Sequence, residues 1–525
     1  MRFSWRSCAV LLARVAIGSM LVGCGGDDED GPGPTEAKQD PPEPLPALGA
    51  APLTTDRTIV ATHAVVATPT QTPNPQVPED LATFLGDGFG AFEYGAALTP
   101  VAHTLDDGAP PEPVGTPTLL SRFVHLADTQ LADDESPTRL ANFDSAGGLT
   151  SAAFRPQEGH ECRVLHAAVR TINRVHQDTP IAFVVLGGDN ADSAQENELD
   201  WFNAVLDGAD SVHCDSGADD DPVPGANNDP KDPFVAEGLL VPWKWVTGNH
   251  DVLVQGNLPV DGFFEASVGS VVNNGTRNWA LPGAPVVSED VPADERRKVM
   301  TRNEMVARVH ASGDGHGIDD GVLSSGKAQY TFDIEGTPIR WIVLDTAAET
   351  GGSEGVVRQG DIDGFLQPAL DAAQAEGKWV ILTSHHASQL LGDGTGLGGT
   401  AQPDAVTTEA FRALVAGYDN VLMHLAGHTH THRVKVATSD GGKPYWEVET
   451  SALADWPQEM RMFEIWDHGE GLVSIHGIPI DFATDDDPIA AEGRELGILD
   501  YTTGWQGDGA GDPADRAIVL WAQMP

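Results

Sequence analysis

Five short apolar runs along this 525-residue chain each end in side chains that can bind a metal ion. The last run, Val421–Leu425, is followed closely by Gly427-His428-Thr429-His430. Two histidines separated by one residue, just past a buried strand, can both offer a ring nitrogen to one cavity. Loops after the carboxyl ends of sheet strands are also where α/β folds place their sites. The sequence therefore predicts an α/β fold whose strand ends converge on a metal centre.

The five clusters share carboxylate, amide or imidazole side chains. In chain order they are Asp128-Thr129-Gln130, Gly188-Asp189-Asn190-Ala191-Asp192, Gly248-Asn249-His250-Asp251, His385-His386 and Gly427-His428-Thr429-His430. Any single cluster could be an ordinary turn or a packed histidine. Together they supply enough ligands for two divalent ions that share one carboxylate, the arrangement that stabilises an in-line displacement at phosphorus.

In this order the clusters resemble the motifs of the calcineurin-like metallophosphoesterase superfamily, which read D-x-H, GDxxD, GNH(D/E), H and GHxH. Four motifs match and the first departs at Gln130, where the pattern most often has histidine. The resemblance covers about residues 121–435. It implies a four-layer α/β-β/α sandwich of two mixed sheets around a dinuclear metal site. The alternation of strand and helix patterns, followed by a run of strands, independently favours a mixed two-sheet sandwich with helices outside.

The resemblance also implies a role for each ligand. Asp189 would bridge the two ions, and a hydroxide shared by the ions would attack phosphorus. The other metal ligands divide into two sets, which are Asp128, Gln130 and His430 on one ion and Asn249, His385 and His428 on the other.

His250 resembles the general acid of the family, which protonates the leaving-group oxygen. Asp192 would hold His250 in its orientation and tautomer, and Asp251 is expected to be structural. Arg155 is open between gripping a phosphate and forming an ordinary ion pair. His386 and His432 are open between reaching the substrate and packing in the fold.

Gln130 bears on the choice of metal and of substrate. A glutamine carbonyl is a neutral and weaker ligand than imidazole, so manganese is expected, with iron and zinc as alternatives. The manganese-dependent ADP-ribose and CDP-alcohol pyrophosphatases are similar in having glutamine here.

A finer resemblance, to a bacterial secreted metallophosphoesterase subfamily of unassigned substrate, rests on the surroundings of the motifs. The stretches that carry it are Asp134-Glu135-Ser136-Pro137, Phe154-Arg155-Pro156-Gln157-Glu158, Asn197-Glu198-Leu199 and Trp446-Glu447-Val448-Glu449-Thr450.

The first 24 residues have the pattern of a targeting segment, with Arg2 and Arg6 before an apolar stretch. Its end, Leu21-Val22-Gly23-Cys24, resembles the lipobox of bacterial lipoproteins. We therefore expect a signal peptide over residues 1–24 and an extracytoplasmic lipoprotein, in the periplasm or at the cell surface, anchored to a membrane through lipid on Cys24. An ordinary secretory signal is the alternative. Cys162 and Cys214 then remain, and they either pair as a disulfide in an oxidising compartment or stay free.

The formal charge of −49, from 79 acidic and 30 basic residues, argues against binding a nucleic-acid polymer through its phosphates. Residues 25–51 are acidic and rich in proline and glycine, which predicts a disordered linker. An N-terminal extension over 52–115, the catalytic domain over 116–485, and a packed C-terminal extension over 486–525 follow. Insertions at 208–238 and 252–326 are where substrate specificity is expected.

The apolar patterns also predict individual elements. Helices are expected over 161–175, 196–206, 365–376 and 408–415. Strands are expected over 121–127, 181–186, 242–246, 328–334, 339–344, 379–382, 421–425, 432–437, 445–449, 462–465 and 473–480.

Three functions are compatible with these features. The leading one is hydrolysis of small phosphate esters at a two-metal centre outside the cytoplasm. The second is phosphodiester or nucleotide-type pyrophosphate hydrolysis at the same site, towards which Gln130 points. The third is a non-catalytic surface lipoprotein that binds metal or a partner.

Overall fold

The computed structural model describes residues 41–525, except for 70–73, 114, 147–149, 151 and 397–398. The expected signal peptide, Cys24 and most of the expected linker lie outside the described residues. The chain divides into two units, residues 1–35 and 36–525, and the described residues belong to the second. None of the helices in the described residues combines the length and apolar character needed to cross a bilayer.

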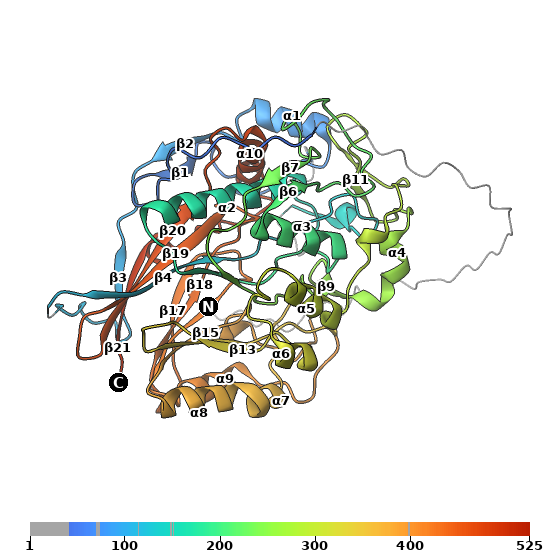
Figure 1. Ribbon diagram of the computed structural model, residues 1–525. Coiled ribbons are helices and arrows are strands. Elements are labelled where there is room, and N and C mark those ends of the chain that lie inside the picture. Colours follow the sequence, from blue (N-terminus) through green and yellow to red (C-terminus); the bar gives the residue numbers. More distant parts are fainter. Residues whose placement is uncertain (1–40, 70–73, 114, 147–149, 151, 397–398) are drawn as a thin grey trace. The chain divides into compact units, whose positions relative to one another are not determined.

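Two large mixed sheets form the centre of the part of the chain that the structure describes (Figure 1). The strands of the first sheet, in hydrogen-bonded order, are β3 (Val101–Thr104), β21 (Ile518–Gln523), β20 (Leu472–Asp481), β19 (Glu459–Asp467), β4 (Thr118–Leu126), β5 (Phe183–Leu186) and β8 (Trp243–Lys244). Those of the second sheet are β13 (Tyr330–Asp333), β14 (Ile339–Val343), β15 (Trp379–Thr383), β16 (Val421–Ala426), β18 (Tyr445–Glu449) and β17 (Arg433–Ala437).

Both sheets mix parallel and antiparallel pairs. β4, β5 and β8 run parallel, whereas β4 pairs antiparallel with β19. β14, β15, β16 and β18 run parallel, and the edge strands β13 and β17 are antiparallel to their neighbours. This topology confirms the predicted α/β fold with two mixed sheets.

The two sheets pack against each other through an aromatic core. The ring of Phe123 in β4 stacks on Phe183 in β5 with centroids 5.5 Å apart and meets the edge of Trp341 in β14 at 4.8 Å. Because side chains alternate along a strand, Trp341 belongs to this inner core, whereas its neighbour Ile342 belongs to a separate core beneath helices on the other face. The alternation thus provides β14 with two buried faces.

Helices cover the outer faces of both sheets. Figure 1 shows α2 and α10 over the first sheet and α8 and α9 along the second, which gives the expected order of helix, sheet, sheet and helix. The helices are α1 (Pro78–Gly86), α2 (Glu161–Asp178), α3 (Glu196–Asp207), α4 (Phe264–Val268), α5 (Arg302–Ala311), α6 (Asp320–Ser325), α7 (Gln359–Asp361), α8 (Gln367–Ala375), α9 (Thr408–Val415), α10 (Pro488–Thr502) and α11 (Pro513–Arg516). Each helix and strand expected from the apolar patterns is present within a few residues of its expected bounds.

Residues outside the motif-bearing span also enter the first sheet. β3 pairs parallel with β21, so segments from near both ends of the described chain lie side by side at one edge. Among the described residues, four two-stranded sheets are separate from the two large ones. They are β1 (Thr58–Ala61) with β2 (Phe92–Gly95), β6 (Ala209–Val212) with β7 (Phe234–Ala236), β9 (Leu253–Val254) with β10 (Leu258–Pro259), and β11 (Thr276–Arg277) with β12 (Val286–Val287).

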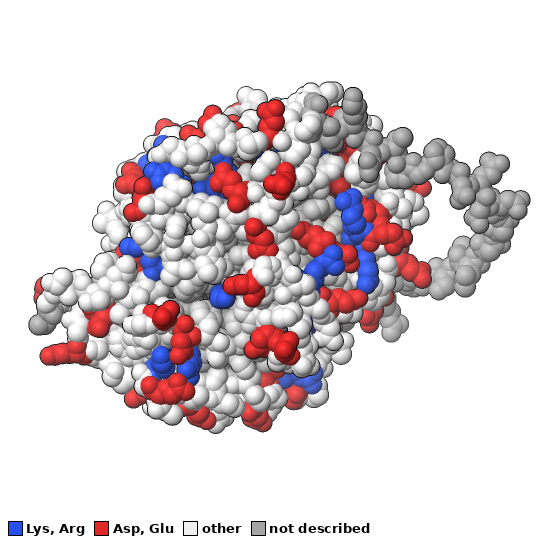
Figure 2. Space-filling view, viewed as in Figure 1, with Lys and Arg blue, Asp and Glu red and all other residues white. Residues whose placement is uncertain are grey.

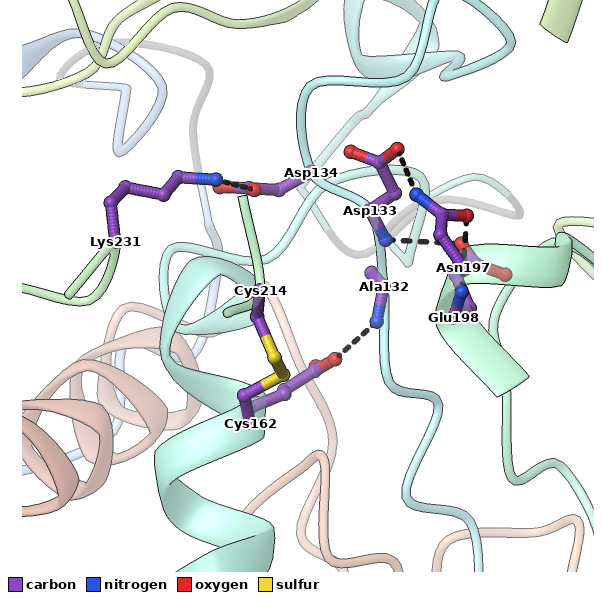
Figure 3. The surroundings of a disulfide bond; sticks show 9 residues. Ala132, Asp133, Asp134, Cys162, Asn197, Glu198, Cys214 and Lys231 are labelled. Carbon is purple, nitrogen blue, oxygen red and sulfur yellow. Dashed lines mark hydrogen bonds and ion pairs between the residues drawn. A yellow bond between two sulfur atoms is a disulfide. The ribbon is translucent and has the colours of Figure 1, made fainter. Parts of the chain in front are cut away.

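A disulfide fastens the insertion at 208–238 to the domain. Cys214, two residues after β6, is bonded to Cys162 in α2, with Cα atoms 6.6 Å apart (Figure 3). For these two cysteines the sequence leaves a disulfide and free thiols as alternatives, and the structure has the disulfide. The end of the expected linker also contacts the domain, because Arg174 and Asn227 donate hydrogen bonds to the carbonyls of Gly49 and Glu43. Figure 2 shows acidic side chains scattered over the face in view, in keeping with the net charge.

Candidate metal centre

The seven predicted metal ligands all lie just past the carboxyl ends of parallel strands. Asp128 and Gln130 follow β4, Asp189 follows β5 and Asn249 follows β8 in the first sheet, whereas His385 follows β15 and the pair His428 and His430 follows β16 in the second. Parallel strands end at the same edge of a sheet, so this topology gathers the ligands where the two sheets meet.

The backbone at these positions is strained. Five of the ligands have positive φ, namely Asp128 (52°), Gln130 (43°), Asp189 (53°), His428 (71°) and His430 (52°). A non-glycine residue in this region costs about 1–3 kcal/mol, and such positions cluster at functional sites. The motif glycines allow close packing, since a Cβ on Gly248 would lie 2.1 Å from Asp189 Oδ1.

Asp189 lies between the two predicted ligand sets. Its Oδ2 is 3.0 Å from His385 Nε2 and 3.4 Å from Gln130 Nε2. His385 Nε2 is also 3.1 Å from Asn249 Oδ1 and 3.2 Å from His428 Nδ1. Burial disfavours the charged form of Asp189, but the His385 and His250 rings outweigh burial and hold the pKa of this carboxyl well below its usual range. An ionised carboxylate therefore stands at the shared position.

Hydrogen bonds of the ligand side chains select the nitrogen that faces the centre. His385 Nδ1 lies 2.7 Å from the Gly187 carbonyl, which leaves Nε2 for a metal. His430 Nε2 is 3.4 Å from Asp128 Oδ1, while its Nδ1 is 2.5 Å from Asp455 Oδ2. In both rings one nitrogen is held by an oxygen acceptor and the other points inward, as metal-binding histidines require.

Gln130 supplies a test of whether these residues suit metal ions. Its Oε1 atom is buried and has no hydrogen-bond partner, which is costly for an amide oxygen unless something else satisfies it. The adjoining donors are carboxylate oxygen and imidazole nitrogen, which suit divalent transition metals. The donor set and the unpaired oxygen together fit a two-metal centre.

His250 lies against Asp192. His250 Nδ1 is 2.8 Å from the backbone carbonyl of Asp192 and 3.3 Å from its Oδ1, and Nε2 is 3.9 Å from Asp189 Oδ2. Arg139, which is fully buried, pairs with Asp192 and with Glu158. Burial lowers the pKa of His250, but Asp189 and Asp192 outweigh burial and raise it above its usual value.

Four further residues singled out in the sequence have structural partners. The Asp251 carboxylate accepts backbone N–H groups of 189, 190, 191 and 248, which fixes the loop around Asp189. His386 is buried, with Nδ1 2.9 Å from Thr346 Oγ1 and Nε2 3.1 Å from a carbonyl. His432 is buried against Glu459 at 3.0 Å. Arg155 forms a two-point ion pair with Asp455.

A cavity of about 300 Å³ opens onto the centre. Its wall includes Asp189, His250 and His430 together with residues that sequence reasoning missed, which are Asp455, Trp456, Gln506 and Asp508. Asp455 follows the Trp446–Thr450 stretch and precedes a Trp-Pro pair, a signal that could have drawn attention to this loop. Gln506 and Asp508 carry no such local signal, since they reach the cavity only through the fold.

Comparison with known proteins is consistent with this geometry. The calcineurin-like phosphoesterase profile matches residues 121–432, and no curated protein sequence matches the chain. Among solved structures, a dimetal phosphatase from Danio rerio is 13% identical, covering 70% of this chain and 100% of its own, with a TM-score of 0.39. A purple acid phosphatase from yellow lupin (Lupinus luteus) seeds is 12% identical, covering 74% and 55%, with a TM-score of 0.31. A sulfate thiohydrolase from Thermus thermophilus is 15% identical, covering 74% and 61%, with a TM-score of 0.30.

Proposed function

Because the chain belongs to the calcineurin-like phosphoesterase family, we propose that it hydrolyses small phosphate esters with two divalent metal ions. The observation that carries this proposal is the position of Asp189, whose Oδ2 lies within 3.4 Å of both ligand sets. Asp128, Gln130 and His430 would hold one ion. Asn249, His385 and His428 would hold the other, with Asp189 shared.

Bound divalent ions would polarise the phosphoryl oxygens and lower the pKa of a water molecule. Manganese is the metal we propose, because Gln130 offers an oxygen where imidazole is usual. Iron and zinc are the alternatives, since the remaining donors include three histidines.

His250 would protonate the leaving group. Because Asp192 holds Nδ1 at 2.8 Å through its carbonyl, Nε2 is the nitrogen that faces the cavity. The raised pKa keeps a proton available on the ring. Asp192 is itself fixed by Arg139, so the orientation of the acid is set by a buried ion pair.

The test is a matrix of metals and substrates on the purified chain, with His250→Ala and Asp189→Ala beside the wild type. We expect Mn²⁺-dependent hydrolysis of aryl phosphates, which Asp189→Ala abolishes. In His250→Ala we expect turnover to fall about 10²- to 10⁴-fold with metal content unchanged. Unchanged turnover would refute the acid role. If no metal supports hydrolysis of any aryl phosphate ester, a non-catalytic metal- or partner-binding role replaces the proposal.

Phosphodiester or nucleotide-type pyrophosphate hydrolysis is a second candidate, favoured by the charge of the cavity wall. Arg155 is the one Lys or Arg among the described lining residues, and Asp455 already engages its guanidinium. Asp508 adds a further carboxylate. A phosphomonoester carries about −1.5 to −2 charges at pH 7, whereas an internal diester phosphate carries one, so a wall without a free cation favours the diester.

The ratio of kcat/KM for bis-aryl and aryl phosphate separates the two candidates. Asp508→Asn should raise kcat/KM for the monoester more than for the diester. The second candidate would be excluded if the wild type has a higher kcat/KM for the monoester and Asp508→Asn leaves the ratio of the two kcat/KM values unchanged.

We also propose that the protein is tethered outside the cytoplasm through lipid on Cys24. The lipobox-like end of residues 1–24 supports this, and a disulfide between Cys162 and Cys214 agrees with an oxidising compartment. Cys24→Ala should move the protein from the membrane fraction to the soluble extracytoplasmic fraction. Retention of the variant in the membrane would argue against lipid attachment at this residue.

A further inference from the structure

The insertion between β6 and β7 contributes to two acidic triads, the first of which also includes Glu135 from the loop after β4. Glu135, Asp215 and Asp220 offer oxygens within 4.8 Å of one another in the first triad. In the second triad the residues are Asp221, Asp229 and Asp232, at the same spacing. Carboxylates this close repel one another unless a cation or a proton lies between them.

The first triad contains a cation that belongs to the chain. Lys231 Nζ lies 2.7 Å from Glu135 Oε2 and 2.9 Å from Asp134 Oδ1, and Figure 3 shows its side chain extended towards Asp134. The lysine is 1% exposed. Lys231 therefore neutralises part of the negative charge of the buried carboxylates around the first triad.

The second triad has no such partner. Among the residues that the structure describes, no Lys, Arg or His nitrogen lies within ion-pairing distance of Asp221, Asp229 or Asp232. The neighbouring Arg163 is already paired with Asp487 at 3.2 Å and donates to Asn227 Oδ1 at 2.9 Å. Arg163 attracts Asp232 only from beyond ion-pairing distance, so within the described part of the chain the three carboxylates have no ion-pair partner.

An unpaired oxygen at this triad points to a ligand. Asp232 is 2% exposed, and its Oδ2 accepts the backbone N–H groups of Asn228 and Asp229 at 2.8 and 3.3 Å. Its Oδ1 has no hydrogen-bond partner, and neither has Oδ1 of Asp221. A buried carboxylate oxygen left without a donor is costly. Burial, opposed by backbone hydrogen bonds, raises the pKa of both Asp229 and Asp232, and the charge of Asp221 adds to it.

We infer that Asp221, Asp229 and Asp232 bind a divalent cation of the calcium class, at a site separate from the catalytic centre. Calcium takes six to eight oxygen ligands from carboxylates, backbone carbonyls and water, and the three side chains offer oxygen alone. Zinc is disfavoured because no histidine or cysteine belongs to this triad. The cation would neutralise the carboxylates of the second triad, as Lys231 does at the first triad.

The site would fix the insertion internally. Asp221 lies in the middle of the loop at residues 213–233 and Asp232 lies at its end, so one ion joins segments that are eleven residues apart in the sequence. The disulfide of Cys214 and the ion pair of Lys231 attach the same loop to the rest of the domain. Calcium should therefore raise the melting temperature of the whole protein rather than change its turnover.

The test is calcium binding by the purified full-length chain loaded with two equivalents of Mn²⁺. Equilibrium dialysis measures bound Ca²⁺, and circular dichroism follows thermal unfolding with and without Ca²⁺. We expect one Ca²⁺ per chain and a higher Tm. Asp221→Asn and Asp232→Asn should each weaken Ca²⁺ binding by about tenfold or more and remove the Tm shift.

Two controls make the outcome decisive. Asp440→Asn removes the same charge at an exposed turn and should bind Ca²⁺ as the wild type does. His428→Ala disturbs the proposed catalytic ligands and should also keep the Ca²⁺-induced Tm shift. Loss of the shift in His428→Ala, with retention in Asp221→Asn, would assign the ion to the catalytic centre and overturn the inference. So would a wild-type protein that binds no Ca²⁺. If Asp232→Asn fails to fold, the half-buried Asp221 carries the test.

Discussion

The Nδ1 atom of His430 lies 2.5 Å from the Oδ2 atom of Asp455. A carboxylate in this position accepts the Nδ1 proton, so that Nε2, which is 3.4 Å from Asp128 Oδ1, is free to bind a metal. Asp455 is itself held by Arg155 and by Gln506, whose Nε2 donates to it at 3.1 Å. Asp455 is therefore a positioning residue for the ion that Gln130 would share.

Asp455→Asn should loosen that ion selectively. Loss of the carboxylate that orients a ligand histidine lowers metal affinity by about 10- to 100-fold, so one of two metal equivalents should be lost at limiting Mn²⁺. Elemental analysis after gel filtration measures this. Asp508→Asn, which changes another carboxylate of the cavity wall, should keep both ions. Two equivalents in Asp455→Asn would show that Asp455 does not position a ligand.

Gln130→His should change the metal preference. An imidazole at this position restores the usual motif and favours zinc and iron over manganese, whereas Gln130→Ala removes the ligand and leaves one ion weakly held. Activity measured against each metal, with metal content determined alongside, distinguishes the variants. An unaltered metal profile in both would mean that the unpaired Oε1 atom of Gln130 is not a ligand.

Removal of the disulfide should destabilise the protein without touching the centre. The bond joins residues 52 positions apart, and the chain-entropy model gives about 4 kcal/mol for a loop of this length. Denaturant unfolding of a Cys162→Ser, Cys214→Ser double variant measures the loss. A reductant should lower the free energy of unfolding of the wild type and leave that of the variant unchanged. Equal stability of the two proteins would contradict the prediction.

Glu198 should make the stability depend on pH. Burial, reinforced by the charge of Asp192, raises the pKa of Glu198 from about 4.5 to about 8. The folded state then binds the proton more tightly than the unfolded state, so this contribution is complete below pH 4.5 and is lost as the pH rises through 8. In Glu198→Gln the free energy of unfolding should fall less steeply across this window. The exposed Glu79→Gln should keep the wild-type slope, and a wild-type slope in Glu198→Gln would contradict the assignment.

The sequence predicts the motif-bearing strands well because their information is local. An apolar run such as Val421–Leu425 fixes a buried strand, and the polar residues that follow it can only lie in the loop at its end. The parallel sheet then brings His385 and His428 within 3.2 Å of each other. The ligand residue types and the order of the strands are therefore sufficient to predict this part of the site.

The remainder depends on contacts between distant segments. Asp455 is held in place by an ion pair with Arg155, which lies 300 residues earlier in the sequence. No local sequence pattern predicts that pairing. Gln506 reaches the cavity after α10, whose weakly amphipathic sequence gives no clear period. The expected C-terminal extension likewise contains β21, which pairs inside the first sheet. The position of β21 in the sheet depends on its pairing with β20, which the local sequence of β21 does not specify.

The distribution of the ligands over both sheets has a consequence for how the protein matures. Asp128, Asp189 and Asn249 come from the first half of the chain, whereas His428 and His430 are synthesised more than 150 residues later. A nascent chain that ends before residue 428 has the carboxylates but lacks His428 and His430, one of which is needed to complete each ligand set. Complete metal loading should therefore require the strands of both sheets, so a chain that holds both ions would be one in which the two sheets have already docked.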